Sequence, residues 1–248
     1  MSTYSIYHSV LKKIEQRIEL SSKKKLLDIG SGKGELIRLV KEKWDLSTFA
    51  CDYTEKWMEV KNQKVEVVDL NTDPLPYSDN SFDIITCTEV VEHLNNYRKL
   101  LQEMYRVLKP QGLVVISTPN LLNLKSRLRF FSFGFWNLFG PLPFDRIQRE
   151  DTDGHISPVH FFYLVHGLHE AGFSKIEISV DKYQRSSMIA LFFFYLPIKF
   201  FGAISFFKEQ AKYRTIQKEN LPYVTLVNTL DLMLGRTVIA TGMKLNER

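Results

Sequence analysis

The stretch LLDIGSGKG at residues 26–34 joins a short apolar run to a turn that contains three glycines. An apolar run that ends in Asp and Gly is typical of a buried parallel strand that enters a glycine turn. Glycine lets the backbone approach a ligand closely, and the helix start that follows presents free amides to a carboxylate or phosphate. The spacing G-x-G-x-G also differs from the G-x-G-x-x-G of dinucleotide-binding proteins. The stretch therefore predicts an α/β fold with a ligand site at this turn.

Short apolar segments alternate with helical ones along the rest of the chain, which predicts a doubly wound parallel sheet with helices on both faces. The expected strands lie at residues 23–30, 47–52, 64–70, 81–88, 112–118, 175–180 and 236–245. The expected helices lie at 4–20, 33–43, 55–61, 90–108 and 158–171. Because no linker stands out, we expect one domain over residues 1–248, with insertions at 120–154 and 182–235.

The composition is that of an ordinary globular protein, since 44% of the 248 residues are hydrophobic and 25% are charged. A net charge of +5 suits an anionic partner such as nucleic acid, a phospholipid surface or a phosphorylated substrate. The two cysteines, Cys51 and Cys87, lack metal-ligand spacing and indicate a reducing compartment. No apolar core of signal-peptide type is present near the N-terminus. We therefore expect a cytoplasmic protein, with the inner face of the cytoplasmic membrane as an alternative location.

Acidic residues stand at or near the ends of the first three predicted strands. Asp52 follows Gly30 by 22 residues, at a strand tip where a carboxylate can accept both hydroxyls of a ribose. Asp69 suits an exocyclic amine such as that of adenine, and Asp28 either orients the turn or faces an ammonium group. Any one of these is also a common turn or capping residue. Three of them at successive strand ends favour a cofactor site.

The segments LLDIGSGKGEL, DLNTDPLPYSDNSFDIITCTEVVEHL and YRVLKPQGLVVISTPN resemble the motif series of class I S-adenosylmethionine-dependent methyltransferases. The resemblance covers residues 24–120 and resumes at 155–180. It implies a Rossmann-like sheet of seven strands, the last one antiparallel, and S-adenosylmethionine as the methyl donor. The cofactor residues it implies are Asp28, Gly30 and Gly32 for the methionine part, Asp52 for the ribose, Asp69 and Leu70 for the adenine, and Ser31, Gly34, Tyr53 and Thr88 as further contacts.

A second set of polar residues follows the fourth predicted strand. Glu89, Glu92 and His93 have the spacing i, i+3 and i+4, so a helix would bring them to one face at the carboxyl edge of the sheet. They could hold a divalent ion such as Mg or Mn, with His155 or His160 as a further ligand. In the alternative, the acid and base shape the pocket without metal, and His93 or His155 is the general base.

The motif Glu-x-x-Glu-His also resembles ubiquinone-biosynthesis O-methyltransferases and small-RNA 3′-terminal 2′-O-methyltransferases. Both use it for a divalent ion and carry a later histidine placed like His155. A metal there would bind substrate hydroxyls and lower the pKa of the attacking one. The resemblance implies an oxygen acceptor, with Glu92, His93 and His155 as catalytic residues.

Two apolar segments lie within the expected insertions. Residues 125–139 mix Lys and Arg with Phe and Trp, which is the composition of a helix in a lipid interface. Residues 188–207 reach the length of a membrane span, although Lys199 and Pro197 lie near the centre. Both insertions follow strands that end at the carboxyl edge, so we expect them to flank the active site.

These features favour an O-methyltransferase that acts on an apolar or lipid-linked small molecule: a quinone precursor, a lipid-linked saccharide or a lipid. Residues 125–139 and 188–207 would make peripheral or monotopic membrane contact, and for 188–207 a true span, a buried lid or a dimer surface are alternatives. An RNA 2′-O-methyltransferase would explain the charge, but phenylalanine clusters without a basic groove disfavour nucleic acid. Intact glycines and acids disfavour a non-catalytic cofactor-binding partner protein.

Overall fold

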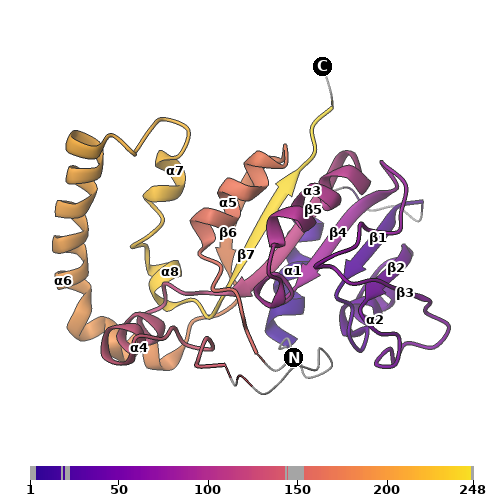
Figure 1. Cartoon of the computed structure of the whole chain (residues 1–248), viewed down its shortest axis with the longest axis horizontal. Helices are drawn as coiled ribbons and strands as arrows, with labels where there is room; N and C mark the ends of the chain where they lie inside the picture. Colours follow the sequence, from indigo (N-terminus) through magenta and orange to yellow (C-terminus); the bar gives the residue numbers. More distant parts are fainter. Residues whose placement is uncertain (1–3, 18, 20–22, 143, 145–153, 247–248) are drawn as a thin grey trace.

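The computed structural model describes the whole chain apart from residues 1–3, 18, 20–22, 143, 145–153 and 247–248. Its centre is a seven-stranded sheet in the order β3-β2-β1-β4-β5-β7-β6 (Figure 1). The strands are β1 (Lys25–Ile29), β2 (Ser47–Asp52), β3 (Val65–Val67), β4 (Phe82–Thr88), β5 (Leu108–Pro119), β6 (Ser174–Val180) and β7 (Thr237–Met243). β7 runs antiparallel to β5 and β6, and the other paired strands are parallel. The Rossmann-like α/β fold with an antiparallel last strand is confirmed.

The described residues form eight α-helices around the sheet. They also form a 3-10 turn at Val91–His93 and a π-helical turn at Glu209–Tyr213. The helices are α1 (Tyr4–Arg17), α2 (Glu35–Lys43), α3 (Tyr97–Val107), α4 (Leu124–Phe133), α5 (Phe161–Glu170), α6 (Arg185–Lys208), α7 (Leu221–Val224) and α8 (Leu230–Leu234). The predicted helices at 4–20, 33–43 and 158–171 are confirmed, although residues 18 and 20 lie outside the described residues.

The strands alternate their side chains between two hydrophobic layers, as the pleat of a sheet requires. Leu26 and Ile84 are fully buried on the face that α1 and α2 cover. Leu27 and Ile85, each one residue further along, are fully buried on the opposite face against α3 and α5. Burial on both faces explains why these strands are continuous apolar runs in the sequence.

Two predicted helices are wrong in whole or in part. Residues 55–61 form turns, in which the Glu59 amide donates to the Lys33 carbonyl at 3.1 Å and so ties the segment to the glycine turn. The helix predicted at 90–108 begins only at Tyr97, after the 3-10 turn, because the Asn96 side chain caps it by accepting from the Lys99 amide. The third strand is also shorter than residues 64–70, since it pairs with β2 alone at the sheet edge.

The two insertions leave the sheet at its carboxyl edge, after β5 and β6. α4 lies in the first insertion, of which residues 143 and 145–153 are outside the described residues, and α6, α7 and α8 lie in the second. α4 packs on α6 through a small cluster that includes Leu124, Ala190 and Met233. In Figure 1, α6 stands away from the sheet at one end of the molecule. The single-domain organisation over residues 1–248 stays a prediction.

Asn120 ties the end of β5 to the chain that returns to β7. Its side-chain amide donates to the carbonyls of Leu232 at 2.9 Å and Gly235 at 2.8 Å, and its Oδ1 accepts from the Leu122 amide at 2.9 Å. The side chain is almost fully buried. Both insertions are thereby held to the edge of the sheet at one residue.

We expect Asn120→Ala to lower the free energy of unfolding by about 2–4 kcal/mol, because it leaves buried carbonyl and amide groups without partners. Urea unfolding followed by circular dichroism measures the change. Asn95→Ala is the matched control, since this asparagine is exposed, and it should change stability by less than about 0.5 kcal/mol. Equal losses in the two variants would contradict the anchoring role.

Candidate functional site

The strand order reverses between β1 and β4, which lie side by side at the centre of the sheet. In open α/β sheets, ligands bind at such a switch point, beyond the carboxyl ends of the strands. The glycine turn follows β1 at this place, and Thr88 is the last residue of β4. The structure therefore brings the predicted cofactor turn and the predicted Glu-His motif to one point of the sheet edge.

The glycines of the turn have different roles. Gly30 has a φ of +68°, and a Cβ there would lie 2.3 Å from Cγ2 of Val90, so only glycine allows this contact. Gly32 has a φ of +50°, and a Cβ there would meet no heavy atom within 4 Å. Gly34 is the N-cap residue of α2. The turn thus packs tightly beneath Val90 and leaves open space beside Gly32, where a ligand can approach the backbone.

Asp52 closes the far side of the turn. Its Oδ2 accepts from the Gly32 amide at 2.7 Å, and its Oδ1 accepts from the Tyr53 amide at 2.7 Å. Burial raises the pKa of this carboxyl above its usual value, and the two amides oppose that rise. Each oxygen keeps a lone pair for a ribose hydroxyl. Asp52 thus lies at the glycine turn, and its contact with a ribose stays a prediction.

Asp28 lies under the turn and is almost fully buried. It accepts a hydrogen bond from the Thr86 hydroxyl at 2.8 Å, which links β1 to β4. Burial raises the pKa of Asp28 to about 7, with the Thr86 bond opposing the rise. Two roles are expected for Asp28. The described contacts favour the first, in which Asp28 orients the turn, and contact with an ammonium group stays a prediction.

The remaining cofactor residues lie around the same point. Ser31 and Thr88 bury hydroxyl oxygens that have no hydrogen-bond partner among the described residues. Buried hydroxyls without partners are uncommon in folded proteins, so both fit a site that a polar ligand completes. Asp69 accepts from the Asn71 amide at 3.0 Å in a turn after β3, and Leu70 beside it is half-buried. Contact of these residues with adenine stays a prediction.

Three side chains gather beside the turn. Possible ligand atoms of Glu92, His93 and His155 all lie within 4.8 Å of one another. The rings of the two histidines meet edge to face with their centroids 4.8 Å apart. Glu92 is fully buried, and its Oε2 accepts from the Thr118 hydroxyl at 3.1 Å. We call Glu92, His93 and His155 the Glu-His cluster.

Backbone contacts bring His155 from the later loop to this place. The Glu92 carbonyl accepts from the amides of Ile156 at 3.0 Å and Ser157 at 2.9 Å. His93 Nδ1 lies 3.2 Å from the Gly154 carbonyl, which can only accept, so Nδ1 carries the proton. The neutral ring therefore has its lone pair on Nε2.

Burial shifts the pKa of all three side chains of the Glu-His cluster. Burial lowers the pKa of His93 and lowers that of His155 to about 4, with the charge of His93 adding to the effect on His155. Burial also raises the pKa of Glu92 well above its usual value, and the nearby Glu89 charge adds to that rise. Burial thus favours the uncharged form of each of the three side chains.

Two expectations about this site are wrong. Glu89, Glu92 and His93 do not share a helix face, because Glu89 has a φ of +55° and precedes a short 3-10 turn. The Glu89 carboxyl accepts instead from the Ser117 hydroxyl at 3.0 Å on β5, and Glu89 is outside the Glu-His cluster. His160 caps α5 by accepting from the Phe162 amide at 3.1 Å, and it is outside the cluster as well.

Sequence reasoning missed Thr118, Val90 and Phe139. Thr118 holds Glu92, Val90 packs on Gly30, and the Phe139 ring lies 5.0 Å from that of His155. A signal for Thr118 was present, because polar residues in the otherwise apolar strand GLVVIST stand at its carboxyl end. Val90 and Phe139 depend on contacts that no local pattern shows.

The Glu-His cluster fits a divalent cation by its donor set of one carboxylate and two imidazoles. Glu92 Oε1 and His155 Nδ1 are both buried without a hydrogen-bond partner in the described part of the chain, as unfilled ligand atoms would be. The predicted ligand set therefore narrows to Glu92, His93 and His155, with Glu89 bound elsewhere.

Comparisons with known proteins show the family of the chain. A family model described as "Methyltransferase domain" matches residues 5–178. A phosphoethanolamine N-methyltransferase of Plasmodium falciparum is 34% identical over 43% of this chain and 43% of its own length. A demethylmenaquinone methyltransferase of Geobacillus stearothermophilus is 31% identical over 53% of this chain and 62% of its own length. The chain thus matches about half the length of these curated relatives.

Solved structures share the fold. A SAM-dependent methyltransferase from Archaeoglobus fulgidus superposes with a TM-score of 0.60 at 18% identity, covering 96% of this chain and 93% of that one. A phosphoethanolamine N-methyltransferase of Haemonchus contortus in complex with S-adenosyl-L-methionine has a TM-score of 0.55 at 16% identity, covering 96% of this chain and 53% of that one. At this level of identity the likeness concerns the fold alone.

We expect Asp52→Asn to weaken S-adenosylmethionine binding by about 10- to 100-fold, because one amide donor would face the Gly32 or Tyr53 amide and the ribose would lose a charged acceptor. Isothermal titration calorimetry measures the affinity. Asp45→Asn, an exposed aspartate after α2, is the control and should bind as the wild type does. Unchanged affinity of the Asp52→Asn protein would remove Asp52 from the site.

A second expectation concerns Asp28 and pH. The folded protein keeps the Asp28 proton up to about pH 7, whereas the unfolded chain releases it near 3.8, so this group lowers stability as pH rises through that window. Asp28→Asn lacks this contribution, and its stability relative to the wild type should therefore increase between about pH 5 and about pH 8. Urea unfolding at both pH values measures it, and a stability difference that does not change with pH would contradict the raised pKa.

Proposed function

The chain belongs to the class I S-adenosylmethionine-dependent methyltransferases, and we propose that it methylates a hydroxyl group of an apolar or lipid-attached acceptor. One observation carries the proposal: two neutral histidines and a buried glutamate stand beside the cofactor turn, next to apolar insertions. The turn and Asp52 serve the donor, and the Glu-His cluster and the insertions serve the acceptor.

The cofactor half of the site orients the methyl donor. Bound S-adenosylmethionine supplies a methyl group on a positively charged sulfur. In the proposal, Asp52 accepts the ribose hydroxyls, the open side of Gly32 receives the methionine part, and the buried hydroxyls of Ser31 and Thr88 complete their hydrogen bonds on the ligand. Asp28 holds β1 and β4 together beneath it.

The Glu-His cluster manages the proton of the acceptor. Oxygen methylation forms an O–CH₃ bond, breaks the S–CH₃ bond and leaves the hydroxyl proton to be removed. His93 Nε2, kept unprotonated by the Nδ1 contact to the Gly154 carbonyl, takes this proton, and His155 is the second candidate base. Because burial holds the pKa of both rings down, each stays available as a base near pH 7.

As an alternative to this metal-free role of the histidines as bases, a divalent cation such as Mg or Mn fits the same residues. Glu92, His93 and His155 would hold it, and it would favour the ionised form of an acceptor hydroxyl bound beside it. Glu92 would then be the carboxylate ligand, since a cation stabilises its charged form.

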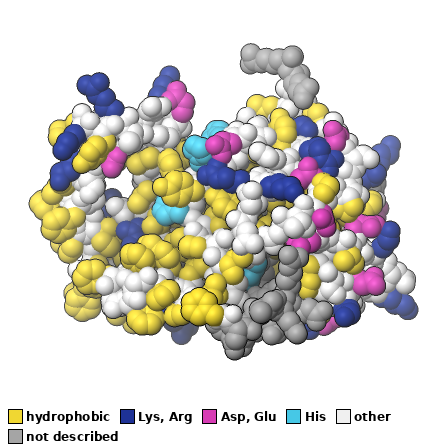
Figure 2. Space-filling view, viewed as in Figure 1, with side chains coloured by type: hydrophobic (Ala, Val, Ile, Leu, Met, Phe, Trp, Pro, Cys, Tyr) yellow, Lys and Arg dark blue, Asp and Glu magenta, His cyan; other side chains and the backbone are white. Residues whose placement is uncertain are grey.

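The surroundings of the Glu-His cluster support an apolar acceptor. Phe139, which follows α4, is buried and packs its ring against His155. Figure 2 shows hydrophobic side chains gathered over the end of the molecule where α4 and α6 lie. A hydrocarbon group would find apolar contacts there, whereas a nucleic acid would need a basic groove.

The relatives differ in the atom that they methylate. One named above is an N-methyltransferase, and a ubiquinone/menaquinone C-methyltransferase of Rickettsia prowazekii is 32% identical over 44% of this chain. Oxygen is favoured by the two neutral bases. A set of matched alkyl-chain acceptors that offer a phenol, an amine or an activated carbon separates these cases, and a methylated amine or carbon product would overturn the oxygen assignment.

We expect His93→Ala to lower turnover by about 100- to 10,000-fold while S-adenosylmethionine affinity changes little, because His93 acts on the acceptor and not on the donor. Single-turnover methyl transfer to the accepted substrate and calorimetry measure the two quantities. His166→Ala is the control, since this exposed histidine pairs with Glu170 away from the cluster. Preserved turnover in His93→Ala and in His155→Ala would show that neither ring is the base.

A further inference from the structure

Helix α6 is apolar on nearly all of its surface and is mostly exposed. Only Ser187 and Ala190 are buried, and Phe192 keeps 85% of its surface exposed. The exposed apolar residues are Met188, Ile189, Phe192, Phe193, Phe194, Tyr195, Leu196, Phe200, Phe201, Ile204 and Phe207. A helix that packs into a protein groove needs only one apolar stripe, so this pattern fits a surrounding apolar medium.

Helix α4 extends this surface. It packs on α6 through Leu124 and Leu128, and its Phe131 keeps 90% of its surface exposed. Phe130, which is also exposed, stacks on Trp136 with ring centroids 4.1 Å apart. In Figure 2 the two helices form one region of hydrophobic side chains, with Lys and Arg at its upper end. We call the exposed side chains of α4 and α6 the apolar arm.

The charges of the apolar arm all have one sign. Within Leu124–Phe133 and Arg185–Lys208 the charged residues are Lys125, Arg127, Arg129, Arg185, Lys199 and Lys208, with no Asp or Glu. Arg127 donates to the Asn228 side chain and to two carbonyls, and burial lowers its pKa to about 10. A second copy of this chain on the same surface would bring cations against cations. Anionic lipid headgroups complement the exposed cations Lys125, Arg185 and Lys208.

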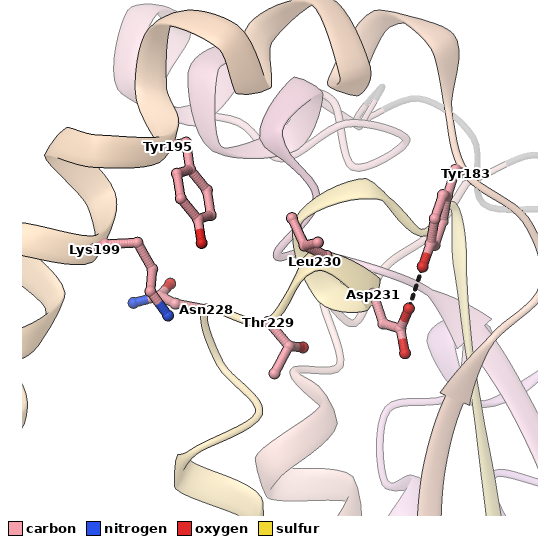
Figure 3. A pocket seen from close by; sticks show the side chains of 7 residues that line it. All are labelled: Tyr183, Tyr195, Lys199, Asn228, Thr229, Leu230 and Asp231. Atoms are coloured by element: carbon pink, nitrogen blue, oxygen red, sulfur yellow. Dashed lines mark hydrogen bonds between the residues drawn. The ribbon is translucent and has the colours of Figure 1, made fainter.

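Lys199 is the only charge within residues 188–207, and it does not interrupt the outer face. With Tyr195 it extends from α6 toward Asn228 and Thr229, where the side chains line a groove of about 400 Å³ (Figure 3). At the far end of this groove Tyr183 hydrogen-bonds to Asp231. The ammonium group thus lies on the inner side of α6, and the outer side remains uncharged.

The course of the chain after α6 disfavours a transmembrane arrangement of this fold. Arg185–Tyr213 is long and apolar enough to cross a bilayer, and it is the one such helix in the described part of the chain. However, the chain returns to the sheet by Tyr223, whose hydroxyl donates to the Ile176 carbonyl of β6. The returning residues 214–220 are not helical, so they could not cross hydrocarbon with their backbone groups satisfied.

We propose that the apolar arm docks on an anionic lipid bilayer, with α6 lying in the plane of one leaflet and α4 beside it. The uncharged outer side of α6 enters the leaflet, and Arg185 and Lys208 at its two ends reach the headgroups. Both helices start from the carboxyl edge of the sheet, so this orientation turns the Glu-His cluster toward the lipid surface. The docking does not depend on which atom the enzyme methylates.

Flotation of the full-length protein with vesicles tests the docking. We expect binding to vesicles of phosphatidylglycerol and phosphatidylcholine, and weaker binding to phosphatidylcholine alone or at high salt. The Phe193→Glu/Phe200→Glu protein should lose bound fraction by roughly tenfold or more, because both rings are exposed and would leave the lipid. Leu245→Glu, an exposed apolar residue after β7, is the matched control and should bind as the wild type does.

Two results would overturn the docking: a wild-type protein that does not float with anionic vesicles, or a double variant that floats as the wild type does. Dimerisation of the wild type that the double variant abolishes, without vesicle binding, would assign the apolar arm to a second copy instead. S-adenosylmethionine binding and turnover on a short, water-soluble acceptor report separately on the proposed function, because neither needs a bilayer.

The in-plane arrangement has its own readout. Gln217 is exposed on the returning segment, and the native Cys51 and Cys87 are buried. Gln217→Cys in vesicle-bound protein should react fully with a membrane-impermeant maleimide added outside. Protection of this cysteine in intact vesicles, lifted by detergent, would show that α6 spans the bilayer and would refute the in-plane arrangement.

Discussion

The contact between Gly30 and Val90 fixes the relation between the two halves of the active site. A Cβ at Gly30 would stand 2.3 Å from the Val90 side chain, so the glycine turn after β1 and the chain after β4 pack as closely as backbone allows. Two and three residues beyond Val90 come Glu92 and His93. The residues proposed to act on the acceptor are therefore set beside the donor turn by one steric constraint, with the Asp28–Thr86 hydrogen bond beneath it.

Burial of the Glu-His cluster, with no opposite charge nearby among the described residues, sets the pKa values of its three side chains. The pKa values of the histidines fall and that of Glu92 rises for the same reason, which is that low-dielectric surroundings disfavour each charged form. Neutral imidazoles are the form that a base or a metal ligand needs. Phe139 and the backbone contacts of the 154–157 loop supply this burial, so the insertion and the later loop belong to the catalytic machinery in the proposal.

The fold could be predicted from the sequence because its signals are local: apolar runs that end at Gly30, Asp52 and Thr88, with helical segments between them. The same strand ends also predicted where the cofactor residues lie. The geometry of Glu89 could not be predicted, because the spacing i, i+3, i+4 has meaning only on a helix and Glu89 adopts a φ of +55°. The approach of His155 depends on the Glu92 carbonyl, 63 residues before it. Whether residues 188–207 are buried or exposed depends on what packs against them, which composition does not encode.

A structure of the protein with S-adenosylhomocysteine bound would show directly whether the methyl donor faces the Glu-His cluster. In the proposed mechanism, the methyl donor and the acceptor meet where the glycine turn faces the Glu-His cluster. We predict that the ribose lies on Asp52 and that the sulfur atom is directed toward His93 and His155, with room for an acceptor oxygen between them. A sulfur atom directed away from both histidines would contradict it.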